Sequence, residues 1–298
     1  MWSFPIEYIE PVFRPPSEAK SLILQVTNGC SWNACTFCDM YTQPQKKFRA
    51  RTDEDILADI ARVRQQWPGV RRVFLADGDA MVLPTRRLIQ ILDALNDAFP
   101  HLERVGSYCL PRNVAKKRVE ELAELRARKL GILYVGAESG DDAVLAGVKK
   151  GETQASTVDA LLKIHAAGIT SSVMILNGLG GLERSEQHAR ESARLLNATQ
   201  PHFVSTLVVS FPLGDARLRE GFGGEWTMPH QRALFEELRL LLECTDLRDS
   251  EFRSDHASNY LVLKGRLGRD KHRLLQEVDL AIHQPGVMPL RQEWQRGL

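Results

Sequence analysis

Strand-like apolar runs alternate with helix-like segments along residues 21–210, and this alternation limits the possible folds more than any other feature. The predicted strands are 21–27, 71–77, 104–108, 132–137, 169–176 and 203–210. The predicted helices are 52–67, 84–99, 114–129, 154–167 and 183–197, with one helical turn ahead of the fourth. Each strand needs a crossover helix to return in the same direction, so the pattern predicts a parallel α/β sheet. An open doubly wound sheet and a barrel-like sheet both satisfy it.

Local signals set the ends of several helices. Thr52–Asp55 resembles a capping box, and Pro84 suits a first helical position. Gly168 is a helix stop. The apolar face predicted for the first helix consists of Ile56, Leu57, Ile60, Val63 and Trp67.

The alternation divides the chain into three predicted parts. Residues 1–20 hold four prolines and are expected to form an extended N-terminal arm, and residues 21–210 form the core. Residues 211–298 are expected to hold one long helix at about 229–244 and less regular segments.

Composition excludes some classes of protein. The formal net charge of +1 lacks the basic excess of a protein that grips phosphates, so a nucleic-acid partner is not favoured. No apolar run approaches the roughly 20 residues that span a bilayer, and the start lacks a secretory signal. We therefore expect a cytoplasmic protein with no membrane partner.

Three of the five cysteines, Cys30, Cys35 and Cys38, fall within nine residues, directly after the first predicted strand. Functional loops of parallel α/β folds lie at the carboxyl ends of strands, and thiolates bind zinc or iron–sulfur clusters. A closed zinc site needs four ligands, and no His lies near this loop. A [4Fe–4S] cluster on three cysteines keeps one iron open to an added ligand. Zinc and unliganded core cysteines remain the alternatives.

This loop resembles the signature of the radical S-adenosylmethionine (SAM) superfamily, which has three cysteines after the first barrel strand and an aromatic residue, here Phe37, before the last. The usual spacing has three residues between the first two cysteines, whereas this chain has four. The resemblance implies an α/β fold, a partial (βα)6 TIM-like barrel with a C-terminal extension, residues 211–298, that closes part of the barrel on its substrate side. It also implies two cofactors, a [4Fe–4S] cluster and SAM.

Further segments resemble the family in order and suggest SAM contacts. Asp77, Gly78 and Asp79 lie where the family has a Gly-Gly-Glu-type turn, although composition alone favours an ordinary acidic turn. Glu138 and Ser139 belong to a Gly-x-Glu-Ser-Gly segment. The remaining candidates are Phe37 of the cysteine loop, Lys150, with Lys149 beside it as an alternative or as a solvated helix end, and Asn177 with Gly178.

The resemblance implies a reaction. An external one-electron reductant such as flavodoxin or ferredoxin reduces the cluster, and SAM is cleaved to a 5′-deoxyadenosyl radical that abstracts hydrogen from a small-molecule or peptide substrate. Aminocarboxypropyl or methyl transfer from SAM would use the same parts. The rival of another class is a non-enzymatic zinc or Fe–S electron-transfer module.

Two cysteines remain outside the loop. Cys109 and its neighbour Tyr108 end the third strand and are candidate catalytic residues, although base rates favour a small buried side chain for Cys109. Cys244 is expected in the core. We expect neither a cobalamin-binding extension nor an RNA-binding module, which argues against methylthiolation of tRNA.

Overall fold

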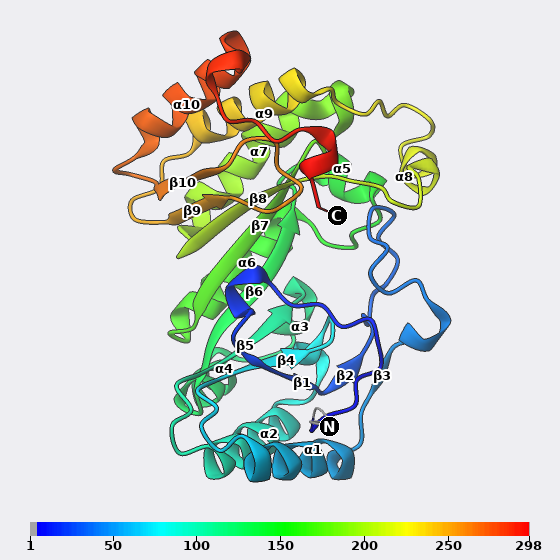
Figure 1. The fold of residues 1–298 in the computed structure, drawn as a ribbon, viewed down its shortest axis with the longest axis vertical. Helices are drawn as coiled ribbons and strands as arrows, with labels where there is room; N and C mark the ends of the chain where they lie inside the picture. The colour runs from blue at the N-terminus through cyan, green and yellow to red at the C-terminus, as the bar shows by residue number, and fades with distance from the viewer. Residues whose placement is uncertain (1–4, 298) are drawn as a thin grey trace. The chain divides into compact units, whose positions relative to one another are not determined.

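The strands of the protein form one large sheet and one small sheet in a computed structural model that describes residues 5–297 (Figure 1). The large sheet has the order β1-β4-β5-β6-β7-β8-β9-β10, and β2 pairs with β3 separately. The first strands are β1 (Leu22–Gln25), β2 (Thr27–Asn28), β3 (Arg49–Ala50), β4 (Arg72–Ala76) and β5 (Arg104–Cys109). The others are β6 (Leu130–Glu138), β7 (Thr170–Asn177), β8 (Phe203–Val208), β9 (Glu251–Ser254) and β10 (Leu263–Arg266).

All six predicted strands are present, and each is followed by a helical crossover as far as β8. In the large sheet, β1 pairs with β4, β4 with β5, β5 with β6, β7 with β8 and β8 with β9 in parallel, whereas β9 and β10 are antiparallel. The small sheet of β2 and β3 is also antiparallel. The predicted α/β class with a mainly parallel sheet is confirmed. The chain divides into two compact units, described separately below.

The first unit comprises the described part of Met1–Asn33 together with Met40–Val135 and Leu162–Ser171. It carries β1 to β5 and most of β6. Its α-helices are α1 (Asp53–Gln66), α2 (Thr85–Ala98), α3 (Pro111–Ala115) and α4 (Val119–Ala127), and its 3-10 turns are η1 (Pro16–Glu18), η2 (Pro44–Lys46) and η3 (Ala80–Val82).

The caps of the first helices explain their limits. Thr52 is the N-cap of α1, and its side chain accepts the Asp55 N–H, as predicted. Leu57, predicted on the buried face, is 48% exposed, because that face follows Ile56, Ile60 and Val63 instead. Pro84 is the N-cap of α2 rather than its first residue, so that prediction was wrong by one position.

The single helix predicted at 114–129 was wrong, because two shorter helices, α3 and α4, occupy this stretch. Between them the buried Lys117 ammonium donates to the Leu83 carbonyl at 2.8 Å. Arg118 then takes an extended backbone, and its N–H donates to the Glu121 carboxylate, which starts α4. A polar interaction outside the helix thus outweighs the helical propensity of the lysines.

The second unit comprises Ala34–Asp39, Gly136–Leu161 and the described part of Ser172–Leu298. Its helices are α5 (Asp142–Gly147), α7 (Gly181–Thr199), α8 (Ala216–Gly221), α9 (Gln231–Cys244) and α10 (Lys271–His283), with 3-10 turns η4 (Pro285–Val287) and η5 (Glu293–Gln295). Helix α6 (Gln154–Ala166) has residues in both units. Helix α9 packs between α7 and α10 (Figure 1).

The segment after β8 is more regular than predicted. It contains α8, α9 and α10, and two strands that the sequence did not reveal. Strand β9 pairs with β8 in parallel, and β10 pairs with β9 in antiparallel. The C-terminal segment therefore continues the sheet. The proposed division at residues 20 and 210 stays a prediction, and the first four residues of the arm lie outside the described part.

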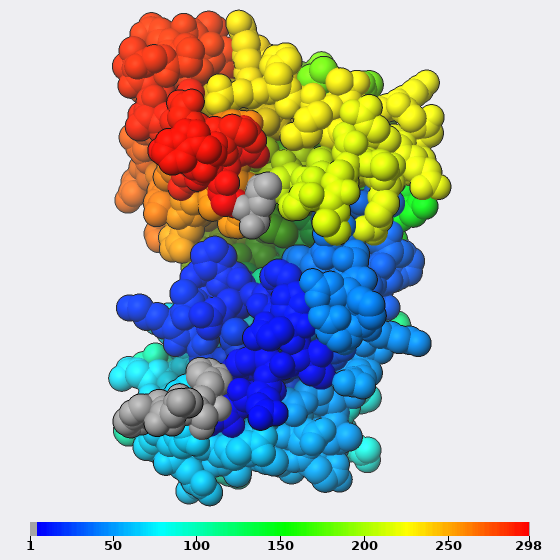
Figure 2. All heavy atoms as spheres, turned by 45° about the vertical axis from the view of Figure 1, so that its right-hand side comes forward, coloured from blue at the N-terminus to red at the C-terminus, as the bar shows by residue number. Residues whose placement is uncertain are grey.

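The last residues of the described chain hold a polar loop that follows β9. Arg291 donates to the carbonyls of His256 and Asn259, and Arg296 donates to the Ser258 carbonyl at 2.7 Å. In Figure 2 the last residues of the described chain, in red, lie on the surface. Within residues 5–297, no helix is both long and apolar enough to cross a membrane.

Candidate active site

In the first unit, two aspartates hold the residues on either side of Cys30. The Gly29 N–H donates to the Asp77 carboxylate at 3.2 Å, and the Ser31 hydroxyl donates to Asp79. Both aspartates follow β4, so the turn after this strand fixes the start of the cysteine loop. Gly29 has φ +71°, and a Cβ there would lie 2.0 Å from the Lys46 carbonyl oxygen, so only glycine fits.

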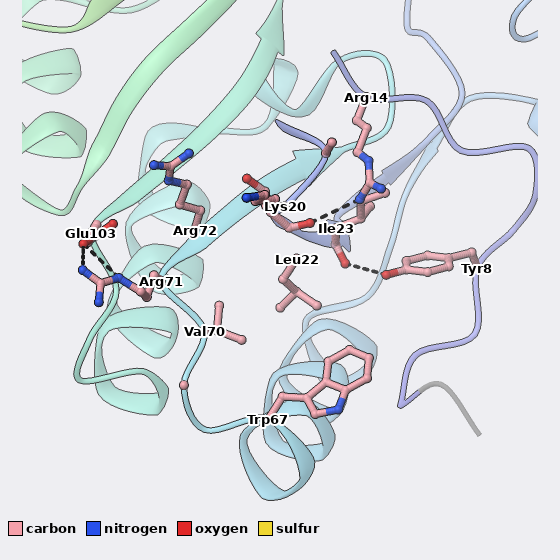
Figure 3. A pocket seen from close by; sticks show the side chains of 13 residues that line it. Tyr8, Arg14, Lys20, Leu22, Ile23, Trp67, Val70, Arg71, Arg72 and Glu103 are labelled. Carbon is pink, nitrogen blue, oxygen red and sulfur yellow. Dashed lines mark hydrogen bonds and ion pairs between the residues drawn. The ribbon is translucent and has the colours of Figure 1, made fainter. Parts of the chain in front are cut away.

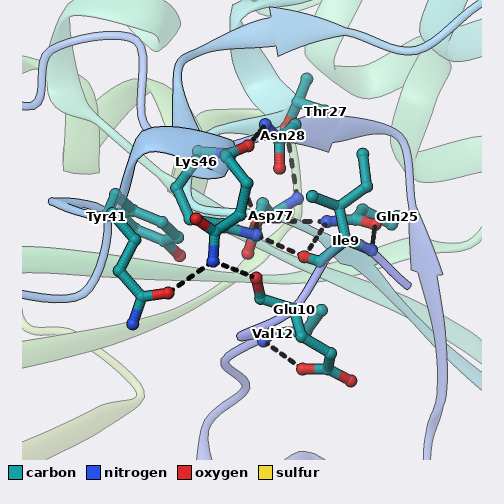
Figure 4. Close-up of polar contacts among 12 residues, drawn as sticks. Ile9, Glu10, Val12, Gln25, Thr27, Asn28, Tyr41, Lys46 and Asp77 are labelled. Carbon is teal, nitrogen blue, oxygen red and sulfur yellow. Dashed lines mark hydrogen bonds and ion pairs between the residues drawn. The ribbon is translucent and has the colours of Figure 1, made fainter.

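Asp77 forms a fully buried ion pair with Lys46 of η2 (Figure 4). Its carboxylate also accepts from the Gln25 amide at 3.3 Å, and the Lys46 ammonium also donates to the Ile9 carbonyl. Burial raises the pKa of Asp77, while the Lys46 ammonium and the donors from Gly29 and Gln25 limit this rise. Asp77 is therefore a structural anchor of the loop, and its contact with a cofactor stays a prediction.

Asp79 is also buried, and it accepts from the Asn113 amide of α3 as well as from Ser31. Burial raises the pKa of Asp79, and these two hydrogen bonds limit the rise. The Arg112 guanidinium lies 3.8 Å from the centre of the Trp32 ring, so α3 also holds the next residue of the loop. These contacts order the residues around Cys30 before any ligand binds.

The other two cysteines of the loop lie in the second unit. A backbone hydrogen bond from Cys38 to the Cys35 carbonyl (3.4 Å) closes a turn. Arg217 of α8 donates to the Cys35 carbonyl at 3.0 Å and to the Asp39 carboxylate at 2.9 Å. All three cysteines of the loop are partly exposed, as a metal or cluster requires.

Over residues 5–297, no group of three or more His, Cys, Asp or Glu side chains is already arranged to hold a metal ion. Ligation of a cluster by Cys30, Cys35 and Cys38 therefore stays a prediction. The chemistry of the donor set supports it, because thiolates are the ligands that iron–sulfur clusters prefer.

The end of β6 carries a buried ion pair in the second unit. Glu138 accepts from the Lys150 ammonium at 2.9 Å, and both side chains are nearly inaccessible. Gly136 makes room for this pair, since a Cβ there would lie 2.1 Å from Glu138 Oε1. The Lys150 ammonium is also 5.8 Å from the centre of the Phe37 ring. Lys149 is exposed, as expected for one of the two lysines.

The other predicted cofactor residues lie at the ends of β6 and β7. The Ser139 hydroxyl lies 2.7 Å from His188 Nδ1 of α7. The Asn177 amide donates to the Leu234 carbonyl of α9 at 3.1 Å. Gly178 has φ +89°, a conformation that favours glycine. Helices α7 and α9 thus position both strand ends.

Two buried oxygen atoms at the ends of β6 and β7 indicate whether the residues there could bind a ligand. Glu138 Oε2 and Asn177 Oδ1 have no hydrogen-bond partner among the described residues. Leaving a buried acceptor unsatisfied costs roughly 1–3 kcal/mol, so such atoms call for a donor. A ligand with amino and hydroxyl groups would supply one, and SAM carries both.

Of the two candidates at the end of β5, Cys109 is buried and Tyr108 is half-buried. Cys109 is 2% exposed, and its thiol lies 3.4 Å from the Leu110 carbonyl oxygen. Tyr108 stacks edge-on against Phe74, with ring centres 5.0 Å apart, and burial raises its pKa. Their catalytic roles stay predictions. Cys244, expected in the core, is partly exposed at the end of α9, so that prediction was wrong.

A groove of about 820 Å³ lies at the other end of the first unit's strands (Figure 3). Its lining includes Ser21 and Leu22 before and within β1, and Arg71 and Arg72 at the start of β4. None of the predicted site residues lines it. Ligand sites of parallel α/β folds lie at the carboxyl ends of strands, so this groove is not our candidate site.

Two buried charged residues that support the site were missed from the sequence. Lys46 stands beside the exposed Lys47, and no local pattern distinguishes them. Glu237 did leave a signal, because it interrupts the apolar stripe of α9 formed by Leu234, Leu238 and Leu241. A charged residue on such a stripe indicates a buried polar partner.

Comparisons with known proteins agree with this geometry. The sequence profile of the Radical SAM superfamily matches residues 24–196, more than half of the chain. A tRNA-2-methylthio-N(6)-dimethylallyladenosine synthase from Alkalilimnicola ehrlichii is 29% identical over 210 residues, which cover 66% of this chain and 44% of that protein. The chain spans less than half the length of the curated relatives that it matches.

Solved structures share the fold. Methylornithine synthase superposes with a TM-score of 0.52 at 16% identity, over 91% of this chain and 83% of that chain. The radical S-adenosylmethionine methyltransferase TsrM from Kitasatospora setae, solved with a bound [4Fe–4S] cluster, superposes with a TM-score of 0.51 at 19% identity, over 63% and 36%. The expected fold class is confirmed. The chain belongs to the Radical SAM superfamily, whose enzymes use a [4Fe–4S] cluster and SAM.

Proposed function

We propose that this enzyme holds a [4Fe–4S] cluster through Cys30, Cys35 and Cys38 and uses it to cleave SAM reductively. The observation that carries the proposal is the cysteine loop itself, with three partly exposed thiols on a backbone fixed by buried aspartates and by Arg217. When bound, the cluster supplies one electron to the sulfonium of SAM, which releases methionine and a 5′-deoxyadenosyl radical.

The residues of the chain have supporting roles in this proposal. Asp77 and Asp79 keep Cys30 in place, and the Cys38–Cys35 hydrogen bond together with Arg217 orders the second part of the loop. Glu138 and Asn177 each offer a buried acceptor oxygen to amino or hydroxyl groups of SAM. The protein thus supplies position and enclosure while the cofactors carry the chemistry.

A small molecule or peptide is the proposed substrate, and an external flavodoxin- or ferredoxin-like protein is the proposed reductant. A tRNA substrate is the second candidate, and the printed names of the curated relatives favour it. Outside the loop, this chain has only two cysteines, Cys109 and Cys244. Two cysteines are too few to bind a second four-cysteine iron–sulfur cluster, so the proposal contains one cluster.

The fragments of SAM distinguish the possible reactions. Anaerobically reconstituted protein, reduced with dithionite, is expected to convert SAM to 5′-deoxyadenosine and methionine in equal amounts. Chromatography with mass detection measures both products. Methylthioadenosine as the main product would instead indicate aminocarboxypropyl transfer, and S-adenosylhomocysteine would indicate methyl transfer. A protein that holds one zinc ion and leaves SAM intact would contradict the proposal.

A further inference from the structure

A buried polar cluster joins the ends of β6 and β7 to helix α9. At its centre Glu237, 4% exposed, accepts from the Gly178 N–H at 2.6 Å through Oε1 and from the Ser185 hydroxyl at 2.6 Å through Oε2. His188 Nε2 lies 3.6 Å from the same Oε1. Glu237 lies beyond the segment that the family profile matches.

His188 extends the cluster to the end of β6. Its Nε2 lies 3.1 Å from the Leu176 carbonyl, which can only accept, so this nitrogen carries a proton. In the neutral ring Nδ1 is then an acceptor for the Ser139 hydroxyl at 2.7 Å, and Ser139 Oγ itself accepts the Asp141 N–H. One buried cluster therefore fixes residues at both strand ends that carry predicted SAM contacts.

The cluster supplies the hydrogen-bond acceptor for the Gly178 N–H. Gly178 has φ +89°, and a Cβ there would lie 2.7 Å from the Leu234 side chain, so the turn is pressed against α9. Helix α9 contacts both residues of the turn, because the Leu234 carbonyl accepts from the Asn177 amide while Glu237 accepts from Gly178. With its amide nitrogen tied down, Asn177 keeps Oδ1 as a buried acceptor without a partner in the described chain.

Burying a carboxylate at this position costs free energy, because the charge is removed from water. Burial raises the pKa of Glu237, and His188, Ser185 and the Gly178 N–H offset only part of that effect. A leucine, like those elsewhere on the same face of α9, would pack there without desolvating a charge. A buried charged acceptor at this point is therefore explained better by the donors it fixes than by packing.

Ser139, His188 and Glu237 have the composition of a hydrolase triad, but burial excludes that use. Ser139 is fully buried, and His188 is 1% exposed. A nucleophile must be reached by its substrate.

We propose that Glu237 is a positioning residue that holds the Asn177–Gly178 turn in the shape that binds SAM. The inference rests on the proposed function, since it assumes that SAM occupies this turn. Glu237 itself touches the turn and not the ligand. Its loss should weaken SAM binding while the cysteine loop and its cluster stay intact.

The test compares three variants of the cluster-reconstituted protein. Glu237→Leu keeps an apolar helix face but removes the acceptor, and Glu237→Gln keeps a neutral acceptor. Glu236→Leu alters the exposed neighbouring glutamate, which pairs with Arg232 on the surface, and is the matched control. Equilibrium titration with SAM gives the Kd, iron and sulfide analysis gives cluster content, and hydrogen–deuterium exchange reports on residues 174–180.

We expect Glu237→Leu to hold as much cluster as the wild type but to bind SAM about 10- to 100-fold more weakly, the cost of losing a hydrogen bond to a charged group. Glu237→Gln should bind SAM roughly two- to fivefold more weakly than the wild type, because a neutral acceptor replaces a charged one. Segment 174–180 should exchange faster in both, and Glu236→Leu should match the wild type.

Wild-type affinity in a folded Glu237→Leu protein would overturn the inference. If Glu237→Leu fails to fold, Glu237→Gln decides, and unchanged SAM affinity together with unchanged exchange of 174–180 would overturn it. A wild-type protein that holds its cluster but binds no SAM would refute the proposed function itself. That result is distinguishable, because it appears before any variant is compared.

Discussion

Replacing any one of Cys30, Cys35 or Cys38 with alanine is expected to abolish the cluster and all cleavage of SAM. A cluster held by three thiolates has no spare protein ligand, so the loss of one leaves two irons poorly coordinated. The wild type should contain about four irons and four sulfides per chain after anaerobic reconstitution. Each variant should fall to the background of the assay, with loss of the broad iron–sulfur absorption.

The two remaining cysteines provide the controls. Cys244→Ala should retain the full cluster, because its thiol is at the end of α9, 3.5 Å from Arg190. Cys109→Ala should also retain it, since Cys109 packs as a small buried side chain after β5. Loss of the cluster in Cys109→Ala would place that thiol in the ligand set and disprove the three-cysteine assignment.

The second large effect is expected at the buried ion pair beneath the loop. Lys46→Met should lower the free energy of unfolding by about 3–5 kcal/mol, because it leaves the Asp77 carboxylate buried without its cation. Asp77 also holds the Gly29 N–H beside Cys30, so the variant should lose iron to a chelator faster than the wild type. Urea unfolding and the rate of iron loss measure the two effects.

The pH dependence of this destabilisation has a definite sign. Burial already raises the pKa of Asp77, and removal of Lys46 should raise it further. A carboxyl group whose folded-state pKa exceeds its unfolded value holds a proton that the unfolded chain releases. Stability is therefore lost as pH rises from the unfolded pKa toward the raised one. The free energy of unfolding of Lys46→Met should be closest to that of the wild type below about pH 4, and the difference should grow as pH rises above that value.

Lys47→Met is the matched control, since Lys47 is exposed one residue away. It should unfold like the wild type at every pH. A Lys46→Met protein as stable as Lys47→Met would show that the Lys46–Asp77 ion pair contributes nothing to the free energy of unfolding. That result would also contradict the role of Asp77 as an anchor of the cysteine loop.

The sequence predicted those parts of the fold that depend on local pattern. Buried parallel strands are continuous apolar runs such as Leu22–Leu24, and helix α1 begins at a capping threonine. Strands β9 and β10 were missed because they are four residues long and rich in charge, as in Glu251–Ser254. Their pairing with β8 and with each other is a long-range interaction that no local pattern reports.

The candidate site divides in the same way. The cysteine spacing, the turn after β4 and the glycine-containing ends of β6 and β7 were visible because each lies within a few residues. The supports of these segments were not, because Lys46 meets Asp77 from 31 residues away and Glu237 meets Gly178 from 59 residues away. The apolar stripe of α9 marks Glu237 as unusual, but only the folded chain shows that it meets Gly178 and that Lys46 rather than Lys47 is buried.

The central claim is that three cysteines of this chain leave one iron of a cluster open for SAM. Mössbauer spectroscopy of the protein reconstituted with iron-57 tests it most directly, with spectra recorded before and after SAM is added. We predict that one iron site differs from the rest and that its isomer shift increases when SAM binds. A protein whose iron sites are all alike and do not respond to SAM would contradict the account.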